Sequence, residues 1–378
     1  MTDRARALQL LQRIERESLY ASLLLIGETG FVRTVVLGVL RWRSRLDFVI
    51  EHFAQRRIAK LDPPVIDALR VGIYQLLYMD VAPYAAVSET VDLAPKRARG
   101  FVNAILRKAS SAKAPEPPDV ATRTAHPQWL LERWTRVYGA ERTAKIADAN
   151  QELSYPDVLS LRGDVPPGAQ PSELVPDLWK LHGSSAELER ESFYPMDEGS
   201  AVIAAIARAC GEDILDLAAA PGGKTIYMRH RGARVLANDV SIARLRPLRH
   251  DKVVVSDGRQ TPFARKFEVV LLDAPCSATG TIRKSPELKW RMREADLAAF
   301  AKLQRELLAH AMTIAGKYVV YSTCSLEPEE NDAVVANYTR EDITPLVPEG
   351  ARKWVQDGVL RLTPESGADG FTAFALRV

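Results

Sequence analysis

Cysteine occurs only three times in this chain of 378 residues, and two of the three stand where apolar strands are expected to end. Cys276 lies in "DAPCSATG" (273–280) and Cys324 in "YSTCSLEPEEND" (321–332), each next to small hydroxyl residues. A buried free cysteine usually serves as a small apolar residue, which is the role expected of Cys210 in the helix-like stretch "AVIAAIARAC". A cysteine at a strand end can instead act as a thiolate nucleophile toward an electron-poor carbon. Cys276 and Cys324 are therefore candidates for covalent catalysis.

Carboxylates occupy the ends of neighbouring apolar runs. Asp239, Asp257 and Asp273 end the second, third and fourth runs, and "LAAAPGGKT" (217–225) joins the first run to a helix. Neither GxxxxGK[ST] nor GxGxxG occurs in that loop, so a phosphate-binding loop is not indicated. Three such acids after a glycine loop indicate a nucleoside held by hydrogen bonds to carboxylates. This pattern favours S-adenosylmethionine over NAD or ATP, and it predicts methyl transfer.

The two cysteines suggest which atom accepts the methyl group. An oxygen or amine acceptor needs only a base and good positioning, whereas carbon 5 of a pyrimidine is too weak a nucleophile to react unaided. Addition of a thiolate to carbon 6 converts the ring into an enamine, which makes carbon 5 nucleophilic. A second group must then help the carbon-5 proton leave, so that the first thiolate is eliminated. A pyrimidine acceptor would therefore use both thiols.

The elements that must position these residues begin near residue 199, where short apolar runs alternate with helical stretches. This alternation predicts a doubly wound α/β sheet with helices on both faces. Ligands of such sheets bind at the carboxyl ends of the strands, where the cysteines and carboxylates stand. The expected strands are 213–219, 233–239, 252–258, 267–275 and 317–325, and the longest helix is expected over 294–315.

The N-terminal part differs in pattern and in charge. Residues 3–108 have helical periodicity throughout, and residues 1–113 hold 18 Lys/Arg against 11 Asp/Glu. Basic residues cluster in "RWRSR" (41–45) and "KRAR" (96–99), which is typical of a surface that binds a polyanion, although a solvated helix face is the alternative. The stretch "SSAKAPEPPDVAT" (110–122) has the composition of a linker.

Composition bounds the remaining possibilities. With 47% apolar and 26% charged residues, the chain is an ordinary globular sequence of two or three domains. Three widely spaced cysteines without a CxxC pair or a Cys/His cluster support neither a disulfide framework nor a metal site, which fits a cytoplasmic protein. No apolar run approaches about 18 residues, so membrane insertion is not expected.

Three motifs resemble those of a known family. The strings "LAAAPGGKT", "DAPCSATGTIRKSPELKW" and "YSTCSLEPEEND" are similar to motifs I, IV and VI of the Sun/Fmu family of RNA cytosine-5 methyltransferases. Residues 67–108 resemble the NusB-like RNA-binding domain. This pairing is characteristic of bacterial enzymes that act on small-subunit ribosomal RNA.

The resemblance implies a fold and its domains. It predicts an all-α NusB-like domain followed by a Rossmann-like, S-adenosylmethionine-dependent methyltransferase domain with a small RNA-binding subdomain. The expected boundaries are 1–112 for the NusB-like domain, 113–125 for a linker, 126–198 for the subdomain and 199–378 for the methyltransferase domain. A monomer that binds small-subunit (16S) ribosomal RNA, with no metal and no membrane, is expected.

The resemblance also implies roles for individual residues. Cys324 becomes the nucleophile, Cys276 the thiol that assists release, and Asp273 the group that shares a proton with N3 of the cytosine. Asp239 is expected at the ribose of the cofactor and Asp257 at its adenine. The residues expected at the methionine end of the cofactor are Ala218, Ala219, Ala220, Pro221, Gly222, Gly223 and Lys224.

The sequence departs from the family pattern at Ala278, where glycine is usual, at Ser285, where histidine is usual, and within 157–165. These departures concern contacts with the target RNA rather than the chemistry. One alternative keeps the chemistry and changes the substrate to transfer RNA. The other, from a different class, is a non-catalytic RNA-binding or assembly factor that retains the methyltransferase fold.

Overall fold

The computed structural model describes residues 1–183, 185, 188–245, 248 and 252–378. The chain forms two compact units. The first, called here the helical unit, contains Met1–Glu152 together with Ile282–Met292. The second, called the α/β unit, contains Leu153–Thr281 and Arg293–Val378.

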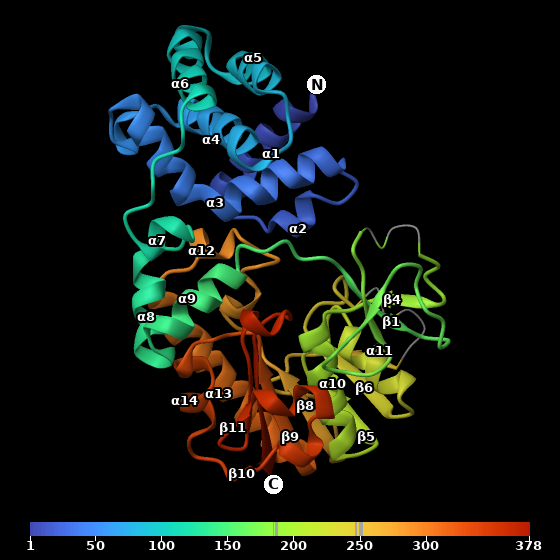
Figure 1. The fold of residues 1–378 in the computed structure, drawn as a ribbon. Coiled ribbons are helices and arrows are strands. Elements are labelled where there is room, and N and C mark those ends of the chain that lie inside the picture. The colour runs from blue at the N-terminus through green and yellow to red at the C-terminus, as the bar shows by residue number, and fades with distance from the viewer. Residues whose placement is uncertain (184, 186–187, 246–247, 249–251) are drawn as a thin grey trace. The chain divides into compact units, whose positions relative to one another are not determined.

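The helical unit begins with a run of helices over residues 3–111, as the periodicity predicts (Figure 1). Several begin at recognisable start signals: the hydroxyls of Thr2 and Thr29 accept hydrogen bonds from first-turn amides, and Pro63 and Pro83 occupy first helical positions. Their apolar stripes form one core. The helices of the unit are α1 (Asp3–Glu17), α2 (Ala21–Leu24), α3 (Gly30–Ala54), α4 (Pro63–Tyr78), α5 (Pro83–Leu93), α6 (Arg99–Ser111), α7 (Val120–Arg123), α8 (Gln128–Tyr138), α9 (Ala140–Ala149) and α12 (Leu288–Arg291).

The two basic clusters of this unit have different surroundings. In the first, Arg41 is only 5% exposed and donates to the carbonyl of Arg283, while Arg45 donates to the carbonyl of Pro115. The polyanion-binding interpretation is therefore wrong for Arg41, whose guanidinium is used inside the unit. In the second cluster, Arg97 has an 80% exposed side chain and a surface ion pair with Asp62 at 2.8 Å. This cluster remains available to an external polyanion.

The α/β unit is built on a mixed sheet. Among the described residues it has nine strands in the order β11-β12-β13-β9-β8-β5-β6-β7, with β10 beside β13. The run from β9 to β7 is parallel, and β11, β12, β13 and β10 add antiparallel pairs. The strands are β5 (Asp213–Asp216), β6 (Arg234–Asp239), β7 (Val253–Val255), β8 (Phe267–Asp273), β9 (Ala315–Thr323), β10 (Arg340–Glu341), β11 (Val355–Gln356), β12 (Val359–Leu362) and β13 (Phe371–Arg377).

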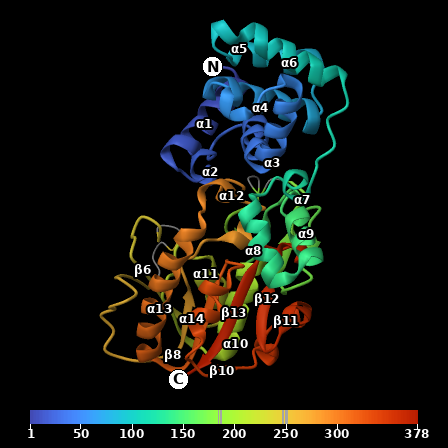
Figure 2. The ribbon, with the colours of Figure 1, turned by 90° about the vertical axis from the view of Figure 1, so that its left-hand side faces the viewer.

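Helices cover both faces of this sheet (Figure 2). Side chains alternate between the faces, so that Ile214 packs in the core with α10 and α11 while the adjacent Leu215 packs in the core with α13 and α14. The five strands expected from the sequence are confirmed, as is the long helix. The helices are α10 (Glu198–Cys210), α11 (Gly223–His230), α13 (Leu297–Ile314) and α14 (Asp332–Val335).

The stretch expected as one subdomain, 126–198, is divided in the structure. Its helices α8 and α9 belong to the helical unit, whereas its C-terminal half forms a small antiparallel sheet in the α/β unit. The predicted linker, 113–125, contains α7. The small sheet has the order β2-β3-β1-β4 and consists of β1 (Asp157–Ser160), β2 (Gln170–Pro171), β3 (Leu178–Lys180) and β4 (Phe193–Pro195). Within the described residues, no helix has the length and apolar character needed to cross a membrane.

Candidate active site

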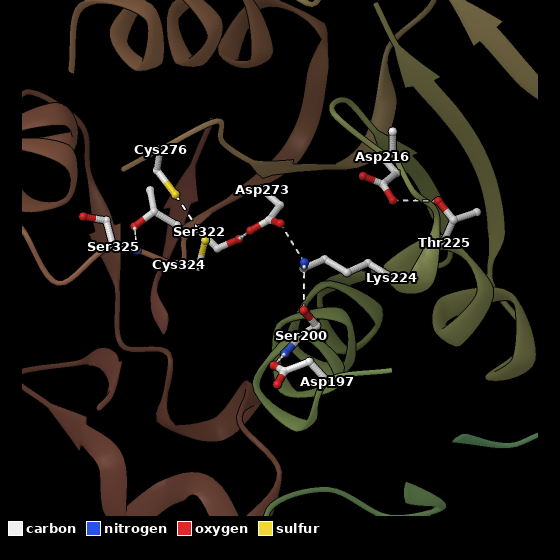
Figure 3. Close-up of polar contacts among 12 residues, drawn as sticks. Asp197, Ser200, Asp216, Lys224, Thr225, Asp273, Cys276, Ser322, Cys324 and Ser325 are labelled. Atoms are coloured by element: carbon white, nitrogen blue, oxygen red, sulfur yellow. Dashed lines mark hydrogen bonds and ion pairs between the residues drawn. The ribbon is translucent and has the colours of Figure 1, made fainter. Parts of the chain in front are cut away.

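The two strand-end cysteines lie side by side. Strands β8 and β9 are parallel neighbours in a register that pairs Asp273 with Ser322, so the segments that follow them leave the sheet at the same edge. The Sγ atoms of Cys276 and Cys324 are 3.3 Å apart (Figure 3). Cys210 lies elsewhere, buried in α10, and burial raises its pKa to about 12. Cys210 thus lies in the core as expected, and Cys276 and Cys324 lie together at the strand edge; their catalytic roles stay predictions.

The surroundings of Cys276 hold this thiol in its protonated form. The hydrogen bond with Cys324 and burial raise the pKa of Cys276 well above its usual value, and the negative charges of Glu330 and Asp273 act in the same direction. Cys276 therefore keeps its proton at neutral pH. Either sulfur can be the donor in the contact between the two thiols.

A lysine and a carboxylate stand next to the thiols. Lys224, in the first turn of α11, places Nζ 2.6 Å from Oδ2 of Asp273 and 3.3 Å from Oγ of Ser200. The other oxygen of Asp273 accepts a hydrogen bond from Ser322 at 2.8 Å. Burial opposes the charge of Lys224, but Asp273, with further attraction from Cys324, outweighs it and raises the lysine pKa. Lys224 is thus an ammonium group whose field favours a thiolate on Cys324.

The positive charge near Cys324 comes from this lysine rather than from the N-terminus of a helix. The sequence after Leu326 predicts a helix whose N-terminal field would favour the thiolate of Cys324, although the charges of Glu327, Glu329 and Glu330 oppose it. The structure instead has a 3₁₀ turn, η6 (Pro328–Glu330), followed by the four-residue α14. One turn of helix carries little macrodipole, because the dipole grows from many aligned peptide units. The nearby positive charge comes from Lys224, which the sequence places only among the cofactor contacts.

A cavity of about 190 Å³ adjoins this cluster. Because it is smaller than the ~300–1,000 Å³ of typical cofactor pockets, it accounts for one end of a nucleoside cofactor. Gly222 has φ of +113°, and a Cβ on it would meet the side chain of Leu248, so both its conformation and its packing require glycine. Gly223 lines the cavity, where the absence of a Cβ leaves its backbone open to a ligand. The cavity is lined by Tyr194, Pro195, Met196, Asp197, Ser200, Asp216, Ala218, Ala219, Ala220, Pro221, Gly223, Lys224 and Asp273.

Asp216 is a site residue that the sequence reasoning missed. Its Oδ2 accepts a hydrogen bond from Thr225 at 2.6 Å, while its buried Oδ1 has no partner among the described residues. Burial raises its pKa to about 6. A buried acceptor beside the cavity fits the ammonium group of an amino-acid moiety, so the residues present are compatible with S-adenosylmethionine. Its position at the end of the first strand was the available signal.

Asp239 ends β6 and Asp257 follows β7, as expected, but neither lines this cavity. Asp239 is buried and accepts hydrogen bonds from the amides of Ala220, at 3.1 Å, and Ser241, at 3.0 Å. Asp257 is half-exposed and is gripped by the guanidinium of Arg259, which lowers the pKa of the carboxyl to about 2. Their ribose and adenine roles stay predictions.

The departure at Ala278 has a structural consequence. Its φ is +59°, in the left-handed region that glycine adopts without penalty. An alanine there costs about 1 kcal/mol or more. The position lies between Cys276 and the 3₁₀ turn at Thr279–Thr281, so the strain is held in the loop that carries one of the two thiols.

A sheet with a parallel core, helices on both faces and a glycine loop after its first strand, with a cavity beside that loop, has the architecture of Rossmann-like, S-adenosylmethionine-dependent methyltransferases, here with an N-terminal helical domain. Family models agree: residues 203–377 match the 16S rRNA methyltransferase RsmB/F family and residues 1–111 match the NusB family. The ribosomal RNA small subunit methyltransferase B of Citrobacter koseri is 33% identical, covering 91% of this chain and 89% of that protein. The chain belongs to this RsmB family of 16S ribosomal RNA methyltransferases.

Other relatives agree with this result. The probable ribosomal RNA small subunit methyltransferase B of Bacillus subtilis is 29% identical, covering 98% of this chain and 97% of its own. Among solved structures, the protein PH0851 superposes with a TM-score of 0.77 at 24% identity, covering 100% of this chain and 99% of its own. NSun6 from Pyrococcus horikoshii has a TM-score of 0.56 at 19% identity, covering 66% and 98%. These structural likenesses show the fold.

Proposed function

We propose that this enzyme methylates carbon 5 of a cytidine in small-subunit ribosomal RNA through a covalent bond between Cys324 and carbon 6 of the base. The observation that carries the proposal is the 3.3 Å approach of two thiols at the ends of adjacent parallel strands. A methyltransferase acting on oxygen or nitrogen has no use for such a pair. The Lys224–Asp273 ion pair supplies the charge and the proton that the addition requires.

The first step is addition to the ring. The thiolate of Cys324 forms a bond to carbon 6, and the ring electrons move to N3, which takes a proton shared with Asp273. Lys224, hydrogen-bonded to that carboxylate, replaces the proton. The ring is now an enamine with a nucleophilic carbon 5. Because the target base must reach a thiol at a strand end, an unpaired cytidine that is already out of its stack is favoured.

S-adenosylmethionine, when bound, supplies an electrophilic methyl group to carbon 5. The proposed contacts are Ala218–Lys224 at its methionine end, Asp239 at its ribose and Asp257 at its adenine. Asp216 is added to these as an acceptor for its ammonium group. Asp239 keeps acceptor capacity for a ribose hydroxyl, because each carboxylate oxygen has two lone pairs and each accepts one backbone amide.

The last step is release, for which Cys276 is suited by its contact with Cys324. Once Cys324 is bonded to carbon, its sulfur no longer carries the negative charge that helps to raise the pKa of Cys276. Cys276 can then lose its proton to water and take the carbon-5 proton. The electrons of that C–H bond restore the ring double bond, N3 returns its proton to Asp273, and Cys324 leaves as a thiolate.

Replacing each of the two cysteines should therefore block methylation at a different step. Cys324→Ala should abolish methylation and form no adduct with RNA, because the bond to carbon 6 cannot form. Cys276→Ala should accumulate a methylated covalent protein–RNA complex that survives denaturing electrophoresis. Cys210→Ala is the matched control, because its thiol is buried away from the site, and it should resemble the wild type.

The opposite pattern, with the adduct retained by Cys324→Ala and absent from Cys276→Ala, would assign the nucleophile to motif IV and reject our assignment. Bisulfite sequencing of RNA from a deletion strain identifies the methylated cytidine, and a site found only in transfer RNA would contradict the ribosomal substrate. Tritium transfer from labelled cofactor to deproteinised small-subunit RNA tests for catalysis. No transfer there or to assembling subunits would favour a non-catalytic factor.

A further inference from the structure

Glu330 is a fully buried carboxylate that contacts both cysteine loops. Its Oε1 accepts hydrogen bonds from the backbone amide of Ser277, at 2.8 Å, and from Nε2 of Gln304, at 3.0 Å. Its Oε2 accepts from the hydroxyls of Ser277 and Ser325. Ser277 directly follows Cys276, and Ser325 directly follows Cys324. One side chain thus joins the two segments that carry the thiols.

We propose that Glu330 is a positioning residue, which sets the distance between the two thiols by holding both cysteine loops on a single carboxylate. The inference rests on the proposed function for its catalytic meaning, but its geometry is independent of it. Sheet register brings Asp273 and Ser322 together, yet both cysteines lie beyond the last paired residues. Something other than the sheet must fix the loops. They contact each other directly, because the Gly280 amide donates to the Cys324 carbonyl at 2.9 Å and the hydroxyls of Ser277 and Ser325 are 3.0 Å apart. Glu330 is bonded to both of these serines and so holds them together.

The chemistry of a carboxylate suits this task. It offers about four acceptor sites and no donor, and here donors come from an amide, a side-chain amide and two hydroxyls. A buried charge is tolerated when hydrogen bonds of this kind compensate it. The carboxylate is itself held in place, because Gln304 also donates to the carbonyl of Pro275 and Tyr321 donates to the carbonyl of Glu330 at 2.6 Å.

The charge of Glu330 has a second effect on the pair. Its negative charge contributes to the raised pKa of Cys276, to which the hydrogen bond with Cys324 and burial contribute more. Glutamine at position 330 can separate geometry from charge. Its oxygen can accept from Ser277 and Gln304, and its NH₂ can donate to the two serine hydroxyls, so the connection survives while the charge is lost.

The experiment measures how fast the two thiols couple, without RNA or cofactor. Diamide takes up two thiol hydrogens as it becomes the hydrazine, leaving a Cys276–Cys324 disulfide at a rate that depends on their proximity. All variants carry Cys210→Ala, so that only the pair reacts. Glu330→Ala should couple at least tenfold more slowly than its parent. Glu330→Gln should form the disulfide no more slowly than its parent. The pH midpoint of its rate of disulfide formation should be lower, because Cys276 ionises more easily without the charge at position 330.

Glu198→Ala is the matched control. Glu198 is also fully buried, but it binds Ser172 and Lys180 rather than the cysteine loops, so its loss should reduce stability without slowing the coupling. Methylation by Glu330→Ala should show a kcat at least tenfold lower, with cofactor affinity within twofold of the parent. If Glu330→Ala does not fold, Ser277→Ala and Ser325→Ala each remove part of the connection and should each slow the coupling.

Coupling at the parent rate in Glu330→Ala, or in both serine variants, would overturn the proposal. So would equal slowing in Glu198→Ala, because that result indicates general loosening of the unit. These outcomes are separate from failure of the proposed function. Absence of an RNA adduct in Cys276→Ala would reject the covalent mechanism and leave the coupling result intact.

Discussion

Each of the two units holds a lysine largely shielded from solvent, and the surroundings shift the pKa values of these two lysines in opposite directions. In the α/β unit, Lys224 faces Asp273 at 2.6 Å, and its pKa is raised because this attraction outweighs burial. In the helical unit, Lys289 is 1% exposed and donates to the backbone carbonyl of Arg41 at 2.8 Å. Burial, with repulsion from the Arg41 guanidinium, lowers the pKa of Lys289 well below its usual value.

The contrast shows that burial alone does not mark a catalytic group. Lys289 and its neighbour Trp290 both donate to carbonyls of α3, which attaches the segment 282–292 to the helical unit. Lys224 belongs to a cluster in which an ammonium, a carboxylate and two thiols converge at a strand edge. In the proposed mechanism, Lys224 takes part in the reaction because groups that can exchange protons with it lie beside it at the site.

The sharpest test of this comparison replaces each lysine with methionine. Lys224→Met should lower kcat by about 10²-fold or more, because it removes the proton source and the charge that stabilises the thiolate. Lys289→Met should keep its activity and be more stable than the wild type at pH 7. A lysine with a depressed folded-state pKa costs no stability above its unfolded pKa of about 10.4, and the cost grows as pH falls. The gain should therefore shrink between pH 7 and pH 10.

Steady-state methylation and thermal unfolding measure the two effects. Equal losses of activity in both variants would show that Lys224 and Lys289 do not differ in their contribution to catalysis. If Lys289→Met gained less stability over the wild type at pH 7 than at pH 10, the pKa of Lys289 would not be lowered in the folded state.

Replacing the buried carboxylate of Asp216 should affect the stability of the fold and the binding of the cofactor in opposite directions. Asp216→Asn keeps an acceptor for Thr225 but loses the charge, and it should weaken S-adenosylmethionine binding by about ten- to a hundredfold. The folded pKa of about 6 lies above an unfolded value of 3.8, so ionised Asp216 destabilises the fold above pH 6, and this cost disappears below pH 3.8. Asp216→Asn should therefore gain about 3 kcal/mol at pH 7.5 and about half of that at pH 5.

Calorimetry with the cofactor and denaturant unfolding at the two pH values provide the measurements. Wild-type cofactor affinity in Asp216→Asn would remove Asp216 from the binding site. A stability gain that does not decrease at pH 5 would show that the charge is not its cause.

The smallest effect is expected in the helical unit. Replacing Lys96 and Arg97 with alanine should weaken RNA binding several-fold and reduce the slope of log affinity against log salt by about 2, because each basic side chain that neutralises a phosphate releases about one counterion. The effect is limited because Arg97 already pairs with Asp62. Filter binding at several salt concentrations measures the slope. An unchanged slope would show that the cluster does not contact the RNA backbone.

Local pattern predicted the strands well, because a run of apolar residues between turn signals carries its own information. The strands from 213 to 323 and the placement of Cys276, Cys324 and Asp273 at their ends follow from it. The pattern gave no warning of the C-terminal strands. β10, β11 and β12 are short, but β13 is seven residues long and pairs regularly with β9. The pattern also treated "RWRSR" as one surface cluster, although Arg41 is buried, because sequence does not show which face of a long helix is covered.

The sequence by itself determined the kinds of groups available and the strand edge at which they gather. Only the tertiary structure decided which of them meet. The parallel register of β8 and β9 places two thiols 3.3 Å apart across 48 residues of chain, and α11 brings Lys224 to Asp273 across 49. It also assigns residues 282–292 to the helical unit and joins both cysteine loops to Glu330. Such contacts depend on long-range packing, for which no local periodicity exists, whereas strands and helices depend on neighbours a few residues away.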